Sequence, residues 1–226
     1  MKTKEKIGIK SYVLRGGRIS KFQKKSLKDL SPEFCIEYSE NKICFGDIFR
    51  NYTEKNPVII EIGFGMGSAT SEIAVKNPGT FYIGIEVYKP GIGNLLGEIK
   101  KNNIENLKII NHDAVLAISN MFGDNSLDGI HIFFPDPWPK KKHHKRRLIN
   151  EEFIGLISKK MKKNGYVYIS TDWEDYAAQI SKVFSNFPEF QNKSETEKPD
   201  WRPLTRFEKK GLIKNHRIFQ FYYKKV

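Results

Sequence analysis

The chain has 226 residues, 39% of them hydrophobic, and a formal net charge of +13 from 39 Lys and Arg against 26 Asp and Glu. This apolar content is enough for a full core, so the composition excludes a wholly disordered chain and predicts one domain. No apolar run approaches the ~18 residues that cross a bilayer, and the basic residues 1–10 have no apolar stretch behind them, which excludes a membrane span and a signal peptide.

The cysteine content gives a further exclusion. Cys35 and Cys44 are the 2 cysteines of the chain, and no His stands near them at ligand spacing. We therefore expect ordinary thiols rather than a disulfide framework or a metal site. Together with the missing signal peptide, this predicts a cytoplasmic protein.

The first 56 residues are expected to be a basic N-terminal arm and lead-in, separate from the domain that follows. Gly16-Gly17 and Ser31-Pro32 interrupt this region. Basic and interrupted sequence of this kind is typical of flexible segments, so we predict a flexible arm over residues 1–28.

Apolar runs alternate with amphipathic stretches from residue 57 onward and predict strands and helices in turn. The predicted strands are Val58–Ile62, Phe81–Val87, Leu107–Asn111, Leu127–Phe134 and Gly165–Thr171. The predicted helices are Ser68–Lys76, Lys89–Asn102, Ala114–Phe122, Asn150–Lys163 and Trp173–Phe184. Polar, loop-like residues 191–202 and a final aromatic run over 217–223 complete the chain. This alternation predicts an α/β domain over residues 57–226 with an open, mostly parallel, doubly wound sheet of the Rossmann-like kind.

A glycine-rich turn follows the first predicted strand of this domain. The segment reads Glu61-Ile62-Gly63-Phe64-Gly65-Met66-Gly67, and alternate glycines allow a backbone to approach a ligand closely at a helix N-terminus. Nineteen residues beyond the last glycine, Glu86 ends the second strand, where a carboxylate can accept hydrogen bonds from ribose hydroxyls. Such a turn alone also serves merely to pass from strand to helix, but with Glu86 it indicates a nucleotide-like ligand.

Two nucleotide-like cofactors compete for this arrangement, a dinucleotide such as NAD and S-adenosylmethionine. A dinucleotide fingerprint requires glycine three residues after Gly65, where this chain has Ser68. Charge also favours S-adenosylmethionine, which has a sulfonium and an ammonium against one carboxylate, whereas NAD has an anionic pyrophosphate. Acidic residues at or beside four strand ends suit that cation, although each one alone is as typical of a helix cap or turn: Glu61, Glu86, Asp113 and Asp136.

A dense basic segment follows the fourth strand of the domain. Residues 137–163 contain 10 basic and 2 acidic residues, whereas residues 61–136 contain 5 and 9. Six of these cations fall within residues 140–147, and their mutual repulsion favours an anionic partner such as a nucleic-acid backbone over a merely solvated loop.

The fourth strand leads into a motif that identifies a family. The string Phe133 to Lys140 reads FFPDPWPK, and it occurs together with the glycine turn, with Ser170-Thr171-Asp172 and with Thr205-Arg206-Phe207-Glu208. Over residues 57–226 this combination resembles the bacterial tRNA (guanine-N7-)-methyltransferase family. The resemblance implies a class I methyltransferase that transfers a methyl group from S-adenosylmethionine to N7 of a variable-loop guanosine in tRNA.

The resemblance also implies roles for individual residues. Asp136 matches the family's proposed active-site residue. Cofactor contacts are implied at Glu61, Gly63, Gly65, Gly67, Glu86, Asp113 and Asp136. Substrate contacts are implied at Lys140, Asp172, Thr205, Arg206, Phe207 and Glu208, and RNA contacts at Lys142, His143, His144, Lys145, Arg146 and Arg147. The family often has Lys where Arg206 stands, which keeps the charge but changes the hydrogen-bonding fork. The expected assembly is a monomer or a homodimer bound to tRNA, without a metal or a membrane.

The chemistry of the reaction fits these residues and leaves some roles open. Guanine N7 has a free lone pair, so alignment matters more than a general base, and Asp136 is expected to stabilise the positive charge that develops on the ring. Trp138 either stacks on the target base or packs the loop onto the fold, and Asp172 either caps the next helix or contacts substrate. The alternative functions are methylation of another RNA or a protein, and RNA binding by a vestigial methyltransferase fold.

Overall fold

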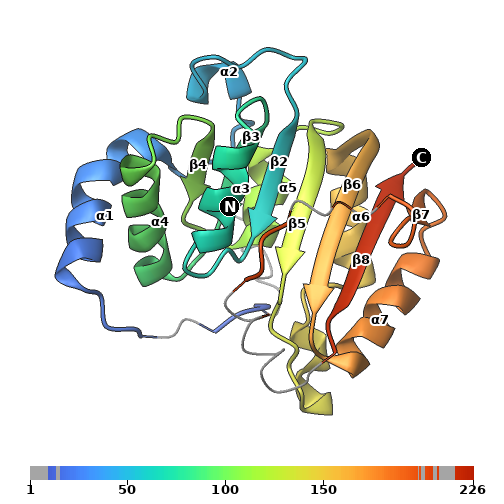
Figure 1. The fold of residues 1–226 in the computed structure, drawn as a ribbon. Helices are drawn as coiled ribbons and strands as arrows, with labels where there is room; N and C mark the ends of the chain where they lie inside the picture. Colours follow the sequence, from blue (N-terminus) through green and yellow to red (C-terminus); the bar gives the residue numbers. More distant parts are fainter. Residues whose placement is uncertain (1–9, 14–15, 198, 200–201, 206–207, 209–216) are drawn as a thin grey trace, which may run out of the picture.

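The computed structural model describes residues 10–13, 16–197, 199, 202–205, 208 and 217–226. Within these residues one sheet runs through the molecule, with the strand order β1-β4-β3-β2-β5-β6-β8-β7 (Figure 1). Neighbouring strands from β1 to β6 are parallel, and β8 pairs antiparallel with both β6 and β7. The strands are β1 Cys35–Ile36, β2 Val58–Ile62, β3 Phe81–Ile85, β4 Leu107–Ile110, β5 Leu127–Phe133, β6 Met161–Thr171, β7 Phe190–Asn192 and β8 Phe219–Lys225.

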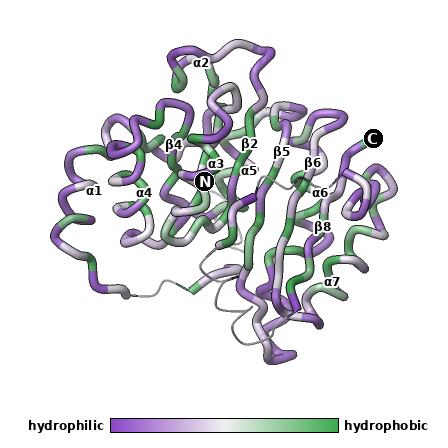
Figure 2. The backbone as a smooth tube through the Cα atoms, in the orientation of Figure 1, coloured by the Kyte–Doolittle hydropathy of each residue, from purple (hydrophilic) through white to green (hydrophobic). Residues whose placement is uncertain are grey.

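Helices cover both faces of this sheet, and each face has its own apolar core. One core joins the sheet to α5, α6 and α7, and the other joins it to α1, α3 and α4. The central strands are largely hydrophobic, while the outer helix α1 and the loops are mostly hydrophilic (Figure 2). The helices are α1 Lys21–Phe34, α2 Phe45–Ile48, α3 Ser68–Lys76, α4 Lys89–Lys101, α5 Ala114–Met121, the 3-10 helix η1 Lys141–Arg146, α6 Glu151–Lys160 and α7 Glu174–Ser185. The predicted doubly wound, mostly parallel α/β fold is confirmed.

The first helix corrects the prediction of a flexible arm over residues 1–28. Ser20 and Gln23 form a capping box, which satisfies backbone groups at the start of α1. The helix then packs so closely on α4 that a Cβ at Gly97 would overlap the ring of Phe22. The prediction is therefore wrong for residues 21–28, because the capping box and the glycine surface of α4 together fix this segment as a helix.

The expected division of the chain at residue 56 does not coincide with a break in the packing. β1 adds to the edge of the sheet beside β4, and Phe45 and Phe49 enter the core beneath the central strands. Residues 20–52 therefore pack as part of the same body as the strands that follow. Within the described residues, no helix is both long and apolar enough to span a bilayer.

Differences at the other predicted elements are small and have local causes. α6 ends at Lys160 rather than Lys163, because the carbonyls of Lys159 and Lys160 accept hydrogen bonds from Asn125 and Ser126 ahead of β5. The chain continues directly into β6, four residues earlier than Gly165. The final aromatic run becomes β8, whose Tyr222 and Phe221 pair with Tyr168 and Ile169 in the middle of the domain.

Candidate cofactor and substrate site

The glycine turn after β2 has a backbone that only glycine adopts without strain. Gly63, Gly65 and Gly67 have φ values of 73°, 58° and 73°, and Gly67 is the N-cap of α3. The turn is closed by a hydrogen bond from the Gly67 amide to the Phe64 carbonyl (2.9 Å). The turn thus lies at the carboxyl edge of the sheet, where an open α/β fold binds its ligand.

Glu86, at the end of β3, connects this turn to the neighbouring strand. One carboxylate oxygen accepts from the Gly65 amide (2.9 Å), and the other accepts from the amides of Val87 (2.7 Å) and Tyr88 (3.0 Å). These bonds also explain why β3 ends at Ile85, two residues before the predicted end. Glu86 therefore fixes the turn in place as well as adding negative charge to the site.

A close contact between the glycine turn and α4 was not predicted from the sequence. A Cβ on Gly91 would overlap the carbonyl oxygen of Gly65, so the helix approaches the turn only because residue 91 is glycine. The sequence contains a weak signal for this contact, since α4 has three glycines, Gly91, Gly93 and Gly97, which an ordinary exposed helix does not require.

Glu61 is the buried acid of the site. It is the fourth residue of β2 and is 4% exposed. Burial raises the pKa of its carboxyl from the ordinary value of 4.5 to about 7, and the Glu86 carboxylate acts in the same direction. A cationic group bound beside Glu61 would favour its ionised form.

A cavity of about 650 Å³ opens at the carboxyl ends of β2, β3 and β5. This volume is within the usual range for sites of small ligands and cofactors. Its wall combines the glycine turn with segments that are distant in sequence, namely residues 11–13, 133–136 and 204–205. The carboxylate-bearing residues on its lining are Glu61, Glu72, Glu86 and Asp136.

Asp113 lies beside this cavity rather than on its lining. It is the N-cap of α5, and its carboxylate accepts from the Leu116 amide at 3.0 Å. The adjacent His112 lines the cavity, and its ring stacks on Tyr38 with 3.7 Å between centroids. The cap is therefore present at Asp113, and its cofactor contact stays a prediction.

The proline-rich loop after β5 brings Asp136 to the cavity in a strained backbone. Phe134 and Trp138, on either side of Asp136, have φ values of 53° and 45°, which residues other than glycine rarely adopt. The Phe134 amide donates to the Ser170 carbonyl of β6 (2.8 Å). Strain of this kind is held in place by the surrounding structure and is typical of functional loops.

Trp138 connects this loop to the N-terminal segment. Its indole N–H donates to the Ser11 carbonyl at 3.0 Å, and the guanidinium of Arg146 lies 5.0 Å from its ring centroid. The ring of His143 is 5.8 Å away. Of the two predicted roles, these contacts support packing of the loop against the fold, and stacking on a base stays a prediction.

The basic segment after the loop forms η1, and its cations differ in exposure. Lys140, Lys141, Lys142 and Lys145 are exposed, and desolvation together with the nearby cations lowers the pKa of His143. Arg147, for which an RNA contact is predicted, is buried instead: its side chain is 1% exposed and is hydrogen-bonded inside the protein. Sequence alone does not separate Arg147 from its basic neighbours.

Three of the remaining predicted substrate residues are described: Asp172 directly follows β6, and Thr205 and Glu208 precede β8. The N-cap of α7 is Trp173, whose amide donates to Thr171 (3.2 Å), so Asp172 is not the cap of that helix. The Glu208 carboxylate pairs with Arg202 at 2.6 and 2.7 Å, and the Glu208 amide donates to Thr205 at 3.0 Å. These bonds hold the Thr205 turn at the cavity. The predicted contacts of Arg206 and Phe207 lie outside the described residues.

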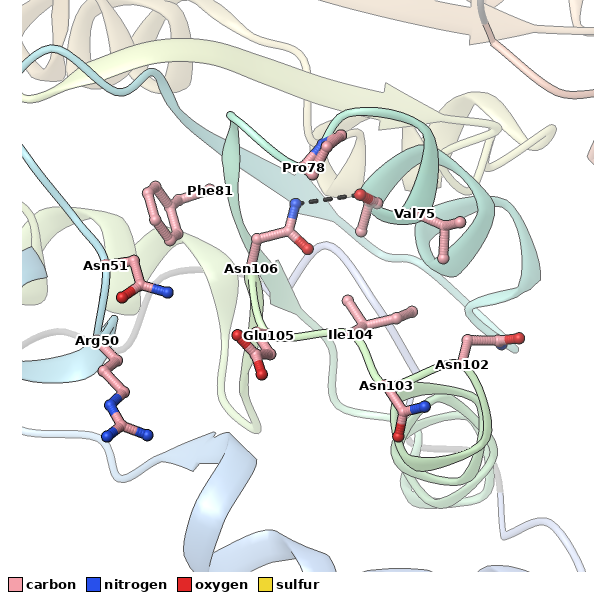
Figure 3. A pocket seen from close by; sticks show the side chains of 11 residues that line it. Arg50, Asn51, Val75, Pro78, Phe81, Asn102, Asn103, Ile104, Glu105 and Asn106 are labelled. Atoms are coloured by element: carbon pink, nitrogen blue, oxygen red, sulfur yellow. Dashed lines mark hydrogen bonds between the residues drawn. The ribbon is translucent and has the colours of Figure 1, made fainter.

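A second cavity, of about 390 Å³, lies at the amino ends of β3 and β4, between Arg50, Pro78 and Glu105 (Figure 3). Asn106 on its wall donates to the carbonyls of Ala74, Asn77 and Thr80 at 2.8 to 3.1 Å. Its side-chain amide is thus committed to fixing the surrounding turns. Among the described residues, no group of three or more His, Cys, Asp or Glu is placed to hold a metal ion.

Comparison with known proteins agrees with this geometry. Residues 55–221 match a family model described as a putative methyltransferase. The fold is similar to that of an aminoglycoside resistance methyltransferase (TM-score 0.52, 14% identity, 75% of this chain and 87% of that chain). It is also similar to precorrin-6y C5,15-methyltransferase from Geobacter metallireducens GS-15 (TM-score 0.52, 13% identity, 95% of each chain). The fold and the family model together define the class of the chain, that of the class I methyltransferases.

Sequence relatives narrow the class to a family. The chain is 45% identical over 221 residues to the tRNA (guanine-N(7)-)-methyltransferase of Francisella philomiragia subsp. philomiragia, covering 96% of this chain and 95% of that protein. It is 44% identical over 220 residues to the protein of the same description from Neisseria meningitidis serogroup C, covering 96% and 91%. The chain belongs to the tRNA (guanine-N7-)-methyltransferase family, which confirms the resemblance carried by the proline-rich motif.

Proposed function

We propose that this chain transfers the methyl group of S-adenosylmethionine to N7 of the variable-loop guanosine of tRNA. The observation that carries the proposal is the full-length relationship to tRNA (guanine-N(7)-)-methyltransferases, joined to a cavity at the carboxyl edge of the sheet. That cavity contains the glycine turn, the buried Glu61 and the proline-loop Asp136 together. We also propose that the chain acts on tRNA in the cytoplasm, as a monomer or a homodimer.

The residues of the cavity fit a cationic, nucleoside-containing cofactor. S-adenosylmethionine supplies an electrophilic methyl group on a sulfonium. The glycine turn lines the cavity without side chains at three positions, so a ligand can approach its backbone closely. Glu86 stands at the end of β3, where the ribose hydroxyls of a nucleoside are typically bound. Glu61 supplies the buried negative charge that favours the cofactor's ammonium or sulfonium, and Asp113 adds charge beside the lining.

Positioning and electrostatics supply the catalysis that this site can perform. The lone pair of guanine N7 forms the bond to the methyl carbon, while the electrons of the sulfur–carbon bond return to sulfur. No proton is removed, so the chain requires alignment and exclusion of water rather than a general base. The Asp136 carboxylate on the cavity wall stabilises the positive charge that develops on the guanine ring.

The basic segment supplies a surface for the RNA backbone beside this wall. Lys140, Lys142 and Lys145 are exposed, and Arg146 covers one side of Trp138. Cations on η1 therefore lie next to the loop that carries Asp136, which would bring a tRNA phosphate and the target base to the same edge of the sheet. Asp172 and Thr205, at the ends of neighbouring segments, are proposed to contact the substrate there.

The proposal is tested by transfer of labelled methyl from S-adenosylmethionine to tRNA that lacks the modification, followed by nucleoside analysis. Recovery of 7-methylguanosine is expected, and it should disappear when the variable-loop guanosine is replaced by adenosine. Another methylated nucleoside, or methylated protein, would keep the methyltransferase class and overturn the substrate. Salt-sensitive tRNA binding without methyl transfer or cofactor binding would favour a vestigial, non-catalytic fold.

A further inference from the structure

Arg147 ends the basic segment, yet its side chain points into the protein. It is 1% exposed, and its planar guanidinium lies 4.9 Å from the ring centroid of Tyr176 on α7. A buried guanidinium requires partners for its N–H donors, because an unpaired buried charge is strongly destabilising. The hydrogen-bond partners of this side chain therefore indicate its structural role.

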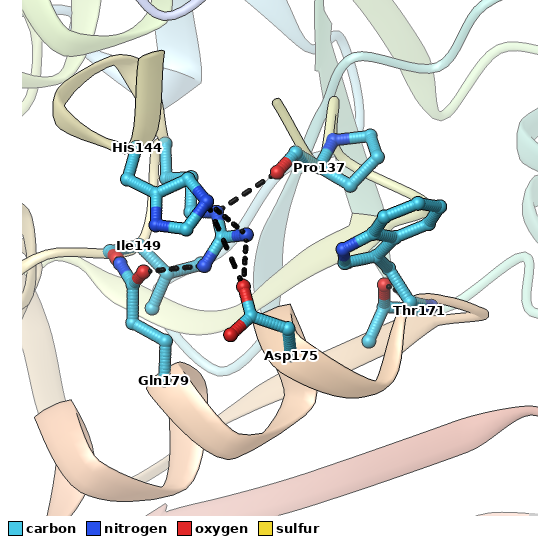
Figure 4. A network of polar contacts seen from close by, with 8 residues as sticks. Pro137, His144, Ile149, Thr171, Asp175 and Gln179 are labelled. Carbon is cyan, nitrogen blue, oxygen red and sulfur yellow. Dashed lines mark hydrogen bonds and ion pairs between the residues drawn. The ribbon is translucent and has the colours of Figure 1, made fainter. Parts of the chain in front are cut away.

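The partners of this guanidinium come from three parts of the chain, the proline-rich loop, η1 and α7. Figure 4 labels these partners as Pro137, His144, Asp175 and Gln179. Nε donates to the carbonyl of Pro137 at 2.8 Å, which is the residue directly after Asp136. Nη1 donates to Gln179 at 2.7 Å, and Nη2 donates to Asp175 at 2.5 Å. Nη2 also lies 3.1 Å from Nε2 of His144 in η1.

The partners on α7 are themselves fixed, so Arg147 is attached to a rigid element. Gln179, which accepts from Nη1 of Arg147, also donates to the carbonyl of Ile149 at 2.9 Å. The hydrogen bond from Arg147 lowers the pKa of the Asp175 carboxyl, as expected for a carboxylate that accepts from a cation. A lysine has one ammonium in place of the planar fork and does not reach these acceptors in the same geometry.

The bond to Pro137 falls within the strained part of the proline-rich loop. Phe134 and Trp138 have positive φ values and bracket Asp136, so this backbone holds its shape only through contacts from outside it. Phe134 is held by β6 and Trp138 by the Ser11 carbonyl. Between these two points, Arg147 donates to the carbonyl of Pro137, the residue next to Asp136.

We propose that Arg147 is a positioning residue for methyl transfer, which clamps the loop carrying Asp136 to α7 and does not contact RNA. The inference rests on the proposed function, since it assigns the clamp a role in that reaction. It divides the basic segment in two. The exposed cations of η1 face the RNA, while Arg147 sets the distance between the catalytic loop and the RNA-binding surface.

The charge-conserving variant Arg147→Lys tests this role. We expect kcat to fall by roughly 10- to 100-fold, the size of effect caused by misplacing a reacting group by about 1 Å. The affinity for tRNA and its dependence on salt should stay unchanged. Lys142→Ala provides the contrast, because loss of an exposed phosphate contact should reduce the slope of log affinity against log salt by roughly 0.7 to 0.9. An equal loss of slope in Arg147→Lys would overturn the proposal.

Tyr176→Phe separates positioning from general stability. This variant removes the hydroxyl that accepts from Ile149 and keeps the ring beside Arg147 and the bond to Pro137. Both variants should lower the melting temperature, but Tyr176→Phe should keep its kcat at a temperature where both are folded. If kcat follows melting temperature in the two variants alike, Arg147 is only a structural residue.

Tryptic cleavage within residues 140–146 gives a measure that does not depend on activity. Its rate, relative to cleavage at Lys100 and Lys101 on α4, should rise several-fold in Arg147→Lys and not in Tyr176→Phe. If the wild-type protein forms no 7-methylguanosine, the proposed function fails by itself. Faster cleavage would then still support the clamp, whereas unchanged cleavage would overturn it.

Discussion

The two halves of the proposed site are built in different ways. The cofactor half is local, because the glycine turn, Glu61, Glu86 and Gly91 all fall within residues 61–91. The Glu86 carboxylate accepts from the turn, and Gly91 approaches the Gly65 carbonyl closely. The catalytic half depends on more distant partners, since the Trp138 indole donates to a carbonyl 127 residues away and the Phe134 amide donates to the Ser170 carbonyl of β6. A local site tolerates changes elsewhere in the chain, whereas the loop depends on several separate contacts. Changes in the two halves should therefore have different consequences.

The largest effect is expected at Asp136 in the catalytic half. Asp136→Asn keeps the shape of the side chain and removes the charge that stabilises the methylated ring, so kcat should fall about 100-fold, with some activity remaining. The affinity for S-adenosylmethionine, measured by calorimetry, should change much less. Full activity with unchanged cofactor affinity would refute the electrostatic role of Asp136.

In the cofactor half, Gly91→Ala should act through backbone displacement. The added Cβ would overlap the Gly65 carbonyl, which forces α4 away from the glycine turn and destabilises the protein by about 1–3 kcal/mol. We expect the dissociation constant for S-adenosylmethionine to rise about tenfold. The matched control is Gly155→Ala in α6, where a Cβ would meet only Phe187 at 3.8 Å, and it should leave cofactor affinity unchanged. Equal effects of the two variants would show that α4 does not shape the turn.

The buried acid of the cofactor half predicts a dependence of binding on pH. Because the pKa of Glu61 is about 7 in the free protein, most molecules must lose a proton at pH 6 before a cation binds to the carboxylate. The affinity for S-adenosylmethionine should therefore increase about tenfold from pH 6 to pH 8 and level off above pH 7. Titration calorimetry in buffers of different ionisation enthalpy should detect proton release at pH 6, and Glu61→Gln should abolish both effects.

The same carboxyl predicts a change in the stability of the free protein. A pKa raised from 4.5 to about 7 means that the folded state holds a proton that the unfolded state has already released between these pH values. The free energy of unfolding should fall as pH rises from 4.5 to 7, by about 3 kcal/mol from this group. Chemical denaturation of wild type and Glu61→Gln across this range measures the difference, and identical slopes would contradict the assignment.

The smallest effect is expected where the two halves meet. Trp138→Phe keeps an aromatic ring and removes the N–H that donates to Ser11, whose segment lines the cofactor cavity. Loss of one such bond, about 1 kcal/mol, should weaken binding of S-adenosylmethionine about fivefold without changing the KM for tRNA. A higher KM for tRNA with unchanged cofactor affinity would instead place the Trp138 ring against the base.

The N-terminal region contains a helix that the sequence-based prediction missed. Ser20 and Gln23 form a capping box that was present in the sequence, but the basic residues around it favoured a flexible arm. The helix α1 is stabilised by packing on the glycines of α4, a helix that is distant from it in the sequence. A short amphipathic helix gains most of its stability from such packing, so its existence depends on a partner that local patterns do not reveal.

The sequence by itself determined the fold class, the cofactor turn and the family, because strands, helices and glycine turns follow from local periodicity and the Phe133 to Lys140 string is highly restrictive. Only the tertiary structure decided the roles of residues whose type was ambiguous. Arg147 has the same charge as its neighbours in the basic segment, and Gly91 resembles any helix glycine. Burial and long-range contacts distinguish them, since these depend on which segments the folded sheet brings together.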